Sequence, residues 1–503
     1  MPKSPHRARV SGGEERTHAF VMKCEKLERM LLGGALWSVC FDRFFSYQAV
    51  KSRFEEKTFK VRDTKTYWAV DSQGEAIQHN VAALTAFHKS EQYWGAIVSN
   101  GGEIQTEIYS LETHRFRKLP LTNRWLEDSG ARAFDRIDSI PPSRDGIAVP
   151  MNIYNTWPGF HAETLPPVPD AEVDCLVQPI LDHLRILLID PKCFNFFVAW
   201  LAQMIQDPSA RTQVVIILQG IQGIGKDIIL QFFIKKVLGA GTGFKTSNPQ
   251  ENIFGTHSVS LQNRVFLLFD EVSGDDIRPY MSKFKDLITS ETSHVNPKNK
   301  TAYDVNNLSN ILGTTNSQNP VHIEPQERRF VVFECSSSKK GDVTYFELLG
   351  AHLARNDVGR AFFQYLRDHV DVRPYVPFQA HRPLTDAYFR MQQRNIPLVF
   401  KFLSAKIEEA TGMANEERAE VGAEEFFQRF KSWGHEGNYK NNHTISRFGA
   451  DLGKLIKELT DTEPSQDTLV KDRSRGGWTY KVNWAQLRAY LQKMTLYDQN
   501  AVV

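Results

Sequence analysis

Residues 220–227, Gly-Ile-Gln-Gly-Ile-Gly-Lys-Asp, carry the residue types in this chain that are best suited to binding phosphate. Glycines let successive backbone N–H groups turn toward one anion, and Lys226 can reach the outer phosphates of a nucleotide. Loops of this pattern normally continue with a Ser or Thr, whose hydroxyl binds Mg²⁺. Asp227 stands at that position, so a candidate Mg²⁺ ligand brings its own negative charge toward the phosphates.

The sequence therefore predicts a nucleoside triphosphate site, and Asp227 makes nucleotide binding a stronger expectation than fast hydrolysis. The residues expected to contact the nucleotide are Gly220, Ile221, Gln222, Gly223, Ile224, Gly225, Lys226 and Asp227. The alternative is a glycine-rich turn between a strand and a helix that binds no ligand.

Two adjacent acids, Asp270 and Glu271, follow the apolar run 265–269. In phosphoryl transfer the first acid of such a pair organises Mg²⁺, and the second orients or polarises the attacking water. An apolar run that ends in Asp-Glu is common by itself. Because this run follows a phosphate-binding loop in the sequence, it favours a hydrolytic site. We expect Asp270 to hold Mg²⁺ and Glu271 to activate water.

Three further polar residues complete the candidate site. Asn316 ends the stretch 310–316, where its amide could bind the γ-phosphate or the attacking water; the alternative is a turn residue at a strand end. Arg328 and Arg329 precede another apolar run, 331–334, where a charged pair indicates a carboxylate or phosphate partner. One of them is expected to reach a neighbouring subunit's site; the alternative is a solvated pair at a strand edge.

A parallel sheet is the element that can bring these residues together. The runs 214–218, 265–269, 310–316 and 331–334 are typical of strands buried on both faces, and residues 228–238 have helical spacing. Open α/β sheets place ligands at the carboxyl ends of their strands, where the loop, the acids and Asn316 all lie. The predicted fold is therefore an α/β P-loop ATPase core.

The order of Gly220–Lys226, Asp270-Glu271, Asn316 and Arg328-Arg329 resembles that of superfamily 3 helicases. It is most similar to the helicase part of phage, virus and plasmid primase-helicases, including the poxvirus-type enzymes. Further segments that match are Tyr154–Phe160, Trp200–Ala202 and Lys298. The resemblance spans residues 150–395, and Asp227 is its main departure from the family pattern.

The resemblance implies an AAA+-type core that assembles as a homohexameric ring, with ATP and Mg²⁺ as cofactors. It implies a replicative helicase of a virus, phage or mobile element that moves on single-stranded DNA and opens forked duplex DNA. A separate primase or polymerase would be a further partner. The alternative function is a replication initiator or loader that uses ATP binding for assembly with little hydrolysis, an idea motivated by Asp227.

Two basic segments are candidate DNA contacts. Residues 295–303 are predicted to form a turn between two strands, and Lys298 and Lys300 near its tip suit backbone phosphates. The resembling helicases carry a DNA-gripping hairpin in this region; the alternative is a solvated loop. Residues 471–482, with Arg473 and Arg475, follow a helix-like segment and have the outline of the wing of a winged helix. The rival interpretation is a helical cap against a neighbouring subunit.

Composition limits the class of protein. The 503 residues are 41% hydrophobic with a net charge of +2, so a nucleic-acid site must be a local patch. Five cysteines without C-x-x-C spacing argue against a zinc ribbon and a disulfide scaffold. The chain has no apolar run of about 18 residues. We expect no membrane association and a soluble intracellular protein of the host cytoplasm or nucleus.

The chain divides into five expected parts. They are a disordered basic tail at 1–20, an N-terminal mixed α+β domain at 21–150, a linker and helical collar at 151–207, the helicase ATPase domain at 208–395, and a C-terminal helical or winged-helix domain at 396–503. Within the N-terminal domain, strands are expected at 65–71 and 103–110 and helices at 24–32 and 81–87. No pair of acids with the Asp-x-Asp spacing of a metal-binding primase-polymerase site occurs there, so a complete primase module is not expected.

Overall fold

The computed structural model describes residues 47–97, 115–142, 146, 148–256, 259–271, 273–317, 320–321, 323, 327–412, 418–439, 442–462, 468–474 and 477–494. The predicted tail 1–20, helix 24–32, strand 103–110 and wing residue Arg475 lie outside the described residues. The chain forms two compact units. The first is Met1–Ile140 with Ile147–Trp157 and His294–Asn306, and the second is Pro141–Gly146 with Pro158–Ser293 and Asn307–Val503.

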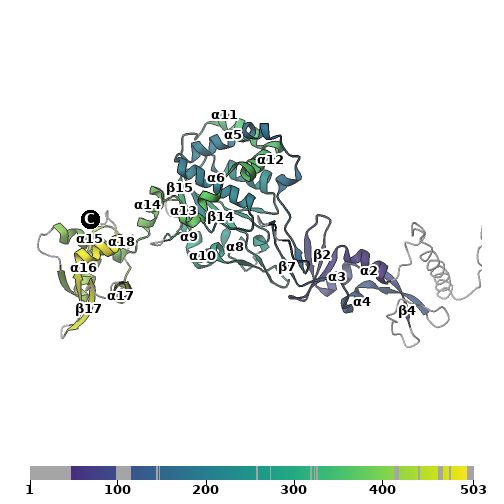
Figure 1. Cartoon of the computed structure of the whole chain (residues 1–503). Coiled ribbons are helices and arrows are strands. Elements are labelled where there is room, and N and C mark those ends of the chain that lie inside the picture. The colour runs from purple at the N-terminus through teal and green to yellow at the C-terminus, as the bar shows by residue number, and fades with distance from the viewer. Residues whose placement is uncertain are drawn as a thin grey trace, which may run out of the picture. The chain divides into compact units, whose positions relative to one another are not determined.

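The first unit is built on a four-stranded sheet with the order β3-β2-β1-β6, of which Figure 1 labels β2. Its strands are β1 (Thr58–Val61), β2 (Thr66–Val70), β3 (Ala76–His79) and β6 (Ala133–Phe134), with β6 parallel to β1 and the other pairs antiparallel. The remaining elements are α2 (Tyr47–Glu55), α3 (Val81–Phe87), α4 (Leu121–Glu127), the pair β4 (Gln92–Ile97) and β5 (Arg115–Pro120), and the pair β7 (Arg136–Asp138) and β8 (Ile153–Asn155). The strand expected at 65–71 and the helix expected at 81–87 are confirmed.

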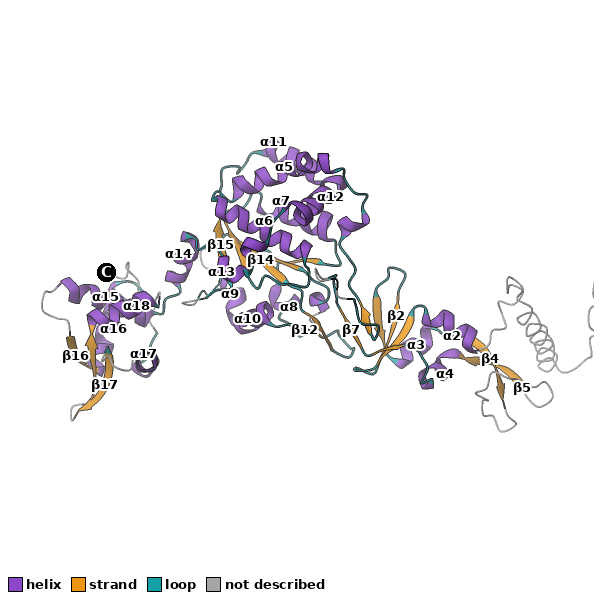
Figure 2. Cartoon of the chain, in the orientation of Figure 1, coloured by secondary structure: helices purple, strands orange, loops and turns teal. Residues whose placement is uncertain are grey.

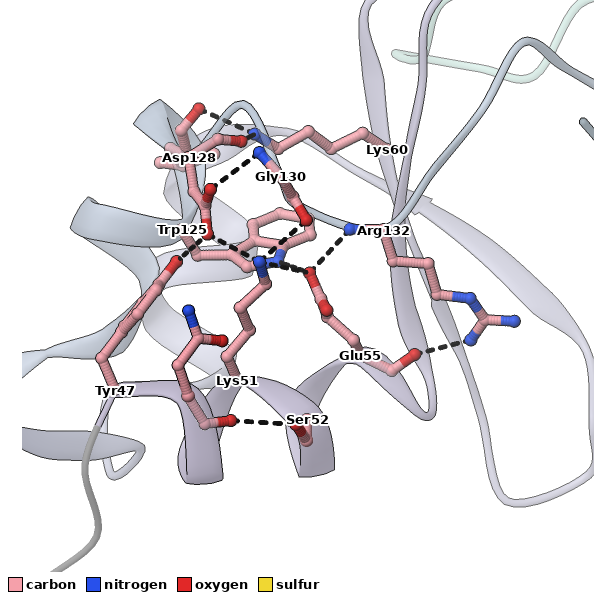
Figure 3. A network of polar contacts seen from close by, with 11 residues as sticks. Tyr47, Lys51, Ser52, Glu55, Lys60, Trp125, Asp128, Gly130 and Arg132 are labelled. Atoms are coloured by element: carbon pink, nitrogen blue, oxygen red, sulfur yellow. Dashed lines mark hydrogen bonds and ion pairs between the residues drawn. The ribbon is translucent and has the colours of Figure 1, made fainter. Parts of the chain in front are cut away.

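A polar network ties α2, α4 and β1 together (Figure 3). The Asp128 carboxylate accepts hydrogen bonds from Tyr47 Oη at 2.6 Å and Lys51 Nζ at 2.8 Å. Lys60 Nζ donates to the carbonyl oxygens of Leu126 and Asp128, both at 3.0 Å, which satisfies free carbonyls at the end of α4. Burial by itself would raise the pKa of Asp128, but the hydrogen bonds from Lys51 and Tyr47 lower it to about 2.

The turn expected at 295–303 does lie between two strands, β12 (Thr292–Val295) and β13 (Tyr303–Asn306). These strands pack with the N-terminal sheet and not with the segments that precede and follow them in the sequence. Val295, Tyr303 and Val305 share one core with residues of β1, β2 and β7, and Gln78 Nε2 donates to the carbonyl oxygen of Thr301 at 3.3 Å. The alternating apolar residues of the hairpin explain this packing, because they give it a buried face.

The second unit contains a five-stranded parallel sheet with the order β10-β11-β14-β9-β15. Its strands are β9 (Val215–Gln219), β10 (Gly243–Thr246), β11 (Phe266–Phe269), β14 (Asn310–Thr315) and β15 (Phe330–Glu334). Every residue of β11 and β14 is buried, as expected for strands covered on both faces. The four strands predicted from apolar runs are confirmed, and β10 is an additional edge strand.

Helices cover both faces of this sheet (Figure 2). One group consists of α5 (Asp170–Leu187), α6 (Pro191–Gln206), α7 (Lys226–Phe232) with the π-helix Phe233–Leu238, α11 (Val343–Leu353) and α12 (Asn356–Gln364) with the π-helix Tyr365–His369. The other includes α8 (Pro249–Asn252), α9 (Gly274–Ile277) and α10 (Met281–Thr289). α5 and α6 lie in the stretch 151–207, where a linker and helical collar were expected. Asp190 caps α6 by accepting from the Lys192 N–H at 2.8 Å.

Residues beyond the core sheet form α13 (Phe378–His381), α14 (Asp386–Arg394) and a C-terminal group with its own apolar core. That group consists of α15 (Leu398–Gly412), β16 (Arg418–Gly422), α16 (Ala423–Glu436), α17 (Ile445–Thr462), β17 (Leu469–Ser474), β18 (Gly477–Asn483) and α18 (Trp484–Lys493). Its sheet is antiparallel with the order β16-β18-β17. β17 and β18 form the antiparallel pair expected for the basic segment 471–482. Among the described residues, no helix is long and apolar enough to span a membrane.

Candidate nucleotide-binding site

The glycine-rich loop connects the carboxyl end of β9 to the start of α7. Gly223 has a φ of +80° and Gly225 a φ of +92°, a left-handed backbone that favours glycine. A Cβ atom on Gly225 would lie 2.6 Å from the His183 ring and 2.7 Å from the Phe346 ring. Glycine is therefore required at 225 by both the backbone and its surroundings, whereas a Cβ on Gly223 would meet nothing within 4 Å.

His183, on α5, packs against this loop and contacts its backbone. Its side chain is fully buried, with Nε2 at 3.1 Å from the Gly225 carbonyl oxygen and Nδ1 at 2.9 Å from the Tyr345 hydroxyl. Burial lowers the pKa of His183, so we assign a neutral ring that donates from Nε2 to Gly225 and accepts the Tyr345 proton at Nδ1. His183 was not among the predicted site residues, because one histidine on an apolar helix face has no distinguishing pattern.

Lys226, the first residue of α7, folds over the loop. Its Nζ donates to the carbonyl oxygens of Gly220 at 2.5 Å and Ile221 at 2.9 Å. Burial lowers the pKa of Lys226, although the carboxylates of the site act in the opposite direction. Backbone oxygens of the loop thus hold the ammonium group of Lys226. Lys226 lines the same pocket as Asp270 and Glu271.

The two acids follow β11 directly. Asp270 Oδ1 accepts from Thr314 Oγ1 at 2.8 Å, and the backbone N–H of Glu271 donates to the same hydroxyl at 3.2 Å. Glu271 has a φ of +55°, a left-handed backbone that is uncommon for a residue with a side chain. Thr314, on the neighbouring strand β14, therefore fixes both acids, a role that its sequence position did not indicate.

Lys245, on the edge strand β10, joins the two candidate Mg²⁺ ligands. Its Nζ lies 2.8 Å from Asp227 Oδ1 and 2.9 Å from Asp270 Oδ2. The other Asp227 oxygen accepts from Gln231 Nε2 at 2.5 Å. Burial alone would lower the pKa of Lys245, but the hydrogen bonds to both carboxylates raise it. Lys245 was not among the predicted site residues.

One pocket of about 440 Å³ lies here, lined by residues 222–228, 270–271, 314–316 and Phe346. The structure thus brings together Gln222 to Asp227, Asp270, Glu271 and Asn316. Gly220 and Ile221 contribute through the carbonyl groups that hold Lys226. The exposed Asn316 side chain faces this pocket from the end of β14.

The donor set suits a Mg²⁺ ion. Oxygens of Asp227 and Asp270 converge on one position, since both contact the same ammonium nitrogen. Carboxylate oxygens are the ligands that Mg²⁺ prefers, and it commonly takes only one or two of them beside waters and substrate phosphates. No cluster of three or more His, Cys, Asp or Glu side chains among the described residues could hold a metal by itself. The residues therefore fit a Mg²⁺ ion that is shared with a nucleotide.

The two arginines lie at the opposite end of the sheet. The Arg329 carbonyl oxygen accepts from the Val215 N–H at 2.7 Å, at the amino end of β9, whereas the pocket is at the carboxyl end. Arg329 Nη1 binds the buried Glu327 carboxylate at 3.0 Å, and Lys285 lies 3.4 Å from the same group. Arg328 is exposed. Neither arginine belongs to the pocket of its own chain.

The predicted DNA contacts lie outside this pocket. Lys298 and Lys300 are exposed in the β12–β13 turn, and Lys300 borders a separate hollow of about 430 Å³ in the first unit with Lys65 and His79. Arg473, exposed on β17, has its guanidinium 5.5 Å from the centre of the Trp478 ring.

Trp478 is a contact candidate that the sequence analysis did not single out. Its side chain is 47% exposed although it is a large aromatic residue, and Lys471 Nζ lies 4.6 Å from the centre of its ring. An exposed aromatic side chain among basic residues is a surface on which bases can stack.

Comparison with known proteins identifies relatives of parts of the chain. Residues 218–329 match the model of a family of unknown function, DUF5906. The DNA primase-polymerase of Nitratiruptor phage NrS-1 is 28% identical over 193 residues, which cover 38% of this chain and 25% of the phage protein. The match therefore spans about a quarter of that relative's length.

Solved structures extend the comparison to the fold. The apo structure of the NrS-1 C-terminal region has a TM-score of 0.53 and 16% identity, covering 88% of this chain and 100% of that one. Its A-form apo structure has a TM-score of 0.53, also at 16% identity, with 87% and 99% covered. At this level of identity the likeness concerns the fold alone. The chain is similar in sequence to a phage DNA primase-polymerase and shares the mixed α/β fold of that protein's C-terminal region.

Proposed function

We propose that the chain is an ATP-dependent DNA helicase of a virus, phage or mobile element, with an AAA+-type core of the superfamily 3 kind. One observation carries the proposal. Left-handed loop glycines, Lys226, the strand-end acids and Asn316 line a single pocket at the carboxyl end of a parallel sheet. The sequence similarity to a phage DNA primase-polymerase supports a role in DNA replication.

ATP would bind with its phosphates against the N–H groups of the loop and the start of α7. Lys226 would exchange the carbonyl oxygens of Gly220 and Ile221 for β- and γ-phosphate oxygens, a change that its long side chain permits without moving the loop. His183 would keep the loop in place through Gly225.

Asp270, with Asp227 as a second ligand, would hold Mg²⁺, which when bound supplies positive charge to the phosphoryl oxygens. Glu271 would accept the proton of the attacking water as the water oxygen bonds to the γ-phosphorus, while the bond from that phosphorus to the β–γ bridging oxygen breaks and ADP leaves. Asn316 would donate to the γ-phosphate or to that water. Thr314 would keep both acids oriented through the contacts described for its hydroxyl.

Arg328 is the better candidate for the residue that acts on a neighbouring subunit. It is exposed at the amino end of β15, whereas Arg329 is engaged by the buried Glu327. A contact between the amino end of one sheet and the pocket of the next subunit is head-to-tail, and such contacts close into rings. A homohexamer is the assembly we propose.

DNA would contact the exposed lysines 298 and 300 of the β12–β13 turn and the basic hairpin β17–β18, which we propose is the wing of a winged helix. Arg473 and Trp478 would act there, and Arg475, outside the described residues, stays a predicted contact. Basic residues suit backbone phosphates and an aromatic ring suits bases. A separate primase or polymerase would be a further partner.

A second function is favoured by one observation. Asp227 and Asp270 are both engaged by Lys245, which competes with a metal ion for their oxygens. Slow hydrolysis would follow if this contact persisted with nucleotide bound, and the protein would then act as an initiator or loader that assembles on ATP binding.

Strand separation tests the proposal. A labelled forked duplex is incubated with ATP, Mg²⁺ and either the wild-type chain or Lys226→Ala, and released single strand is measured. Unwinding by the wild type that disappears in Lys226→Ala and with a non-hydrolysable ATP analogue is the expected result. ATP-dependent assembly on the fork without strand release would support the loader, and unwinding by Lys226→Ala would refute the assignment of the loop.

A further inference from the structure

Asp227 presents an electrostatic difficulty in a site for a triphosphate. It lies next to Lys226 in the lining of the pocket, where phosphate-binding loops of this pattern carry an uncharged hydroxyl. Its side chain is 45% exposed and lines the pocket into which the phosphates would enter. Like charges at short range in a partly enclosed site oppose binding.

Lys245 is positioned to remove this repulsion. Its Nζ lies 2.8 Å from Asp227 Oδ1 and, on its other side, 2.9 Å from Asp270 Oδ2. Gln231 holds the second oxygen of Asp227 from the next turn of α7. The carboxylate is thus fixed on both oxygens, and one of them is paired with a cation.

The fold explains why a lysine from this strand reaches the site. β10 is the edge strand next to β11, and Lys245 is level with Leu268, two residues before Asp270. A long side chain at this position extends along the carboxyl end of the sheet to the acids. Its partners come from α7 and from the end of β11, so three segments far apart in the sequence meet at one ammonium group.

We propose that Lys245 is a positioning residue that neutralises Asp227 and so makes this acidic variant of the loop able to bind a triphosphate. The inference rests on the nucleotide binding proposed for this pocket. Lys245 and Asp227 thus act as a pair. A carboxylate can replace the usual hydroxyl at position 227 because Lys245 neutralises its charge.

The test is a double-mutant cycle on nucleotide affinity, with a fluorescent ATP analogue in the presence of EDTA so that no metal ion contributes. Lys245→Met removes the charge but keeps most of the side-chain length, and Lys245→Arg keeps the charge. Both are made in the wild-type chain and in Asp227→Thr, which restores a hydroxyl. Lys235→Ala, on an exposed position of the π-helix after α7, is the matched control.

In the wild-type background we expect Lys245→Met to weaken binding about tenfold, which corresponds to about 1.4 kcal/mol, and Lys245→Arg to retain most of the affinity. In the Asp227→Thr background the same Lys245→Met change should weaken binding less than about threefold, because the charge to be neutralised is gone. Lys235→Ala should have no effect. Circular dichroism identifies any variant that does not fold, and Asp227→Thr with Lys245→Met then shows whether binding returns.

An equal loss in both backgrounds would overturn the proposal, since Lys245 would then act on the nucleotide or Asp270 and not through Asp227. Unchanged affinity of Lys245→Met in the wild-type background would overturn it as well. Failure of the proposed function looks different: the wild-type chain itself would not bind the analogue, or Lys226→Ala would bind it equally well.

Discussion

Replacing Gly225 by alanine should disrupt the loop through two separate effects. The left-handed backbone at +92° costs an L-residue about 1–2 kcal/mol. The new Cβ would also lie 2.6 Å from the His183 ring, which cannot retreat because it is fully buried and bonded at both nitrogens. Overpacking of this kind costs about 1–3 kcal/mol, so the total expected loss is about 2–5 kcal/mol.

Gly223→Ala is the matched control, because Gly223 has a similar φ of +80° but open space around the position of a Cβ. It should cost only the backbone term of about 1–2 kcal/mol. Hydrogen exchange of the α7 amides measures the local free energy of opening in each variant, which avoids treating a chain of two units as one cooperative transition.

Removing the opposing side chain provides the decisive comparison. In a His183→Ala background the part of the Gly225→Ala cost that comes from the His183 ring should disappear, leaving the backbone cost and the 2.7 Å contact with the Phe346 ring. If Gly225→Ala is no more destabilising than Gly223→Ala, or if His183→Ala does not reduce the difference, the loop is not seated on His183 and the reasoning is wrong.

Three further predictions concern other parts of the chain. Arg328→Ala should lower ATP turnover about a thousandfold and be rescued in rings mixed with Lys226→Ala subunits, whereas absence of rescue would exclude action in trans. Asp128 has a pKa of about 2 in the folded chain against 3.8, so its stabilisation of the first unit is present above about pH 4 and lost as pH falls toward 2. Asp128→Asn should therefore cost about 1–2 kcal/mol at pH 7 in urea unfolding, after allowance for solvent screening, and nothing near pH 2. Trp478→Ala should weaken single-stranded DNA binding by about 1–3 kcal/mol in fluorescence anisotropy, and unchanged affinity would remove the stacking role.

The core sheet could be predicted from the sequence because its strands are buried on both faces. Runs such as 265–269 are continuously apolar, and that pattern indicates both a β-strand and its burial on both faces. β10 lacks this pattern, since Gly243-Phe-Lys-Thr is short and half polar at the sheet edge. β16, with charged residues on its exposed face, was missed for the same reason.

The candidate site was predictable only where its residues follow one another in sequence. The glycine loop and the Asp270-Glu271 pair are local patterns with a chemical meaning of their own. His183, Lys245 and Thr314 act through contacts with Gly225, Asp227 and Asp270, residues remote from them in the chain, and a single sequence contains no record of such contacts. The partner of the β12–β13 hairpin was hidden in the same way.

Steady-state ATP hydrolysis with and without single-stranded DNA, for the wild-type chain and Lys226→Ala, tests the central claim most directly. We expect ATP turnover that DNA stimulates and that the substitution abolishes, because the motor needs both the phosphate-binding loop and the DNA strand. ATP binding with negligible turnover in either condition, or turnover that Lys226→Ala leaves unchanged, would contradict it.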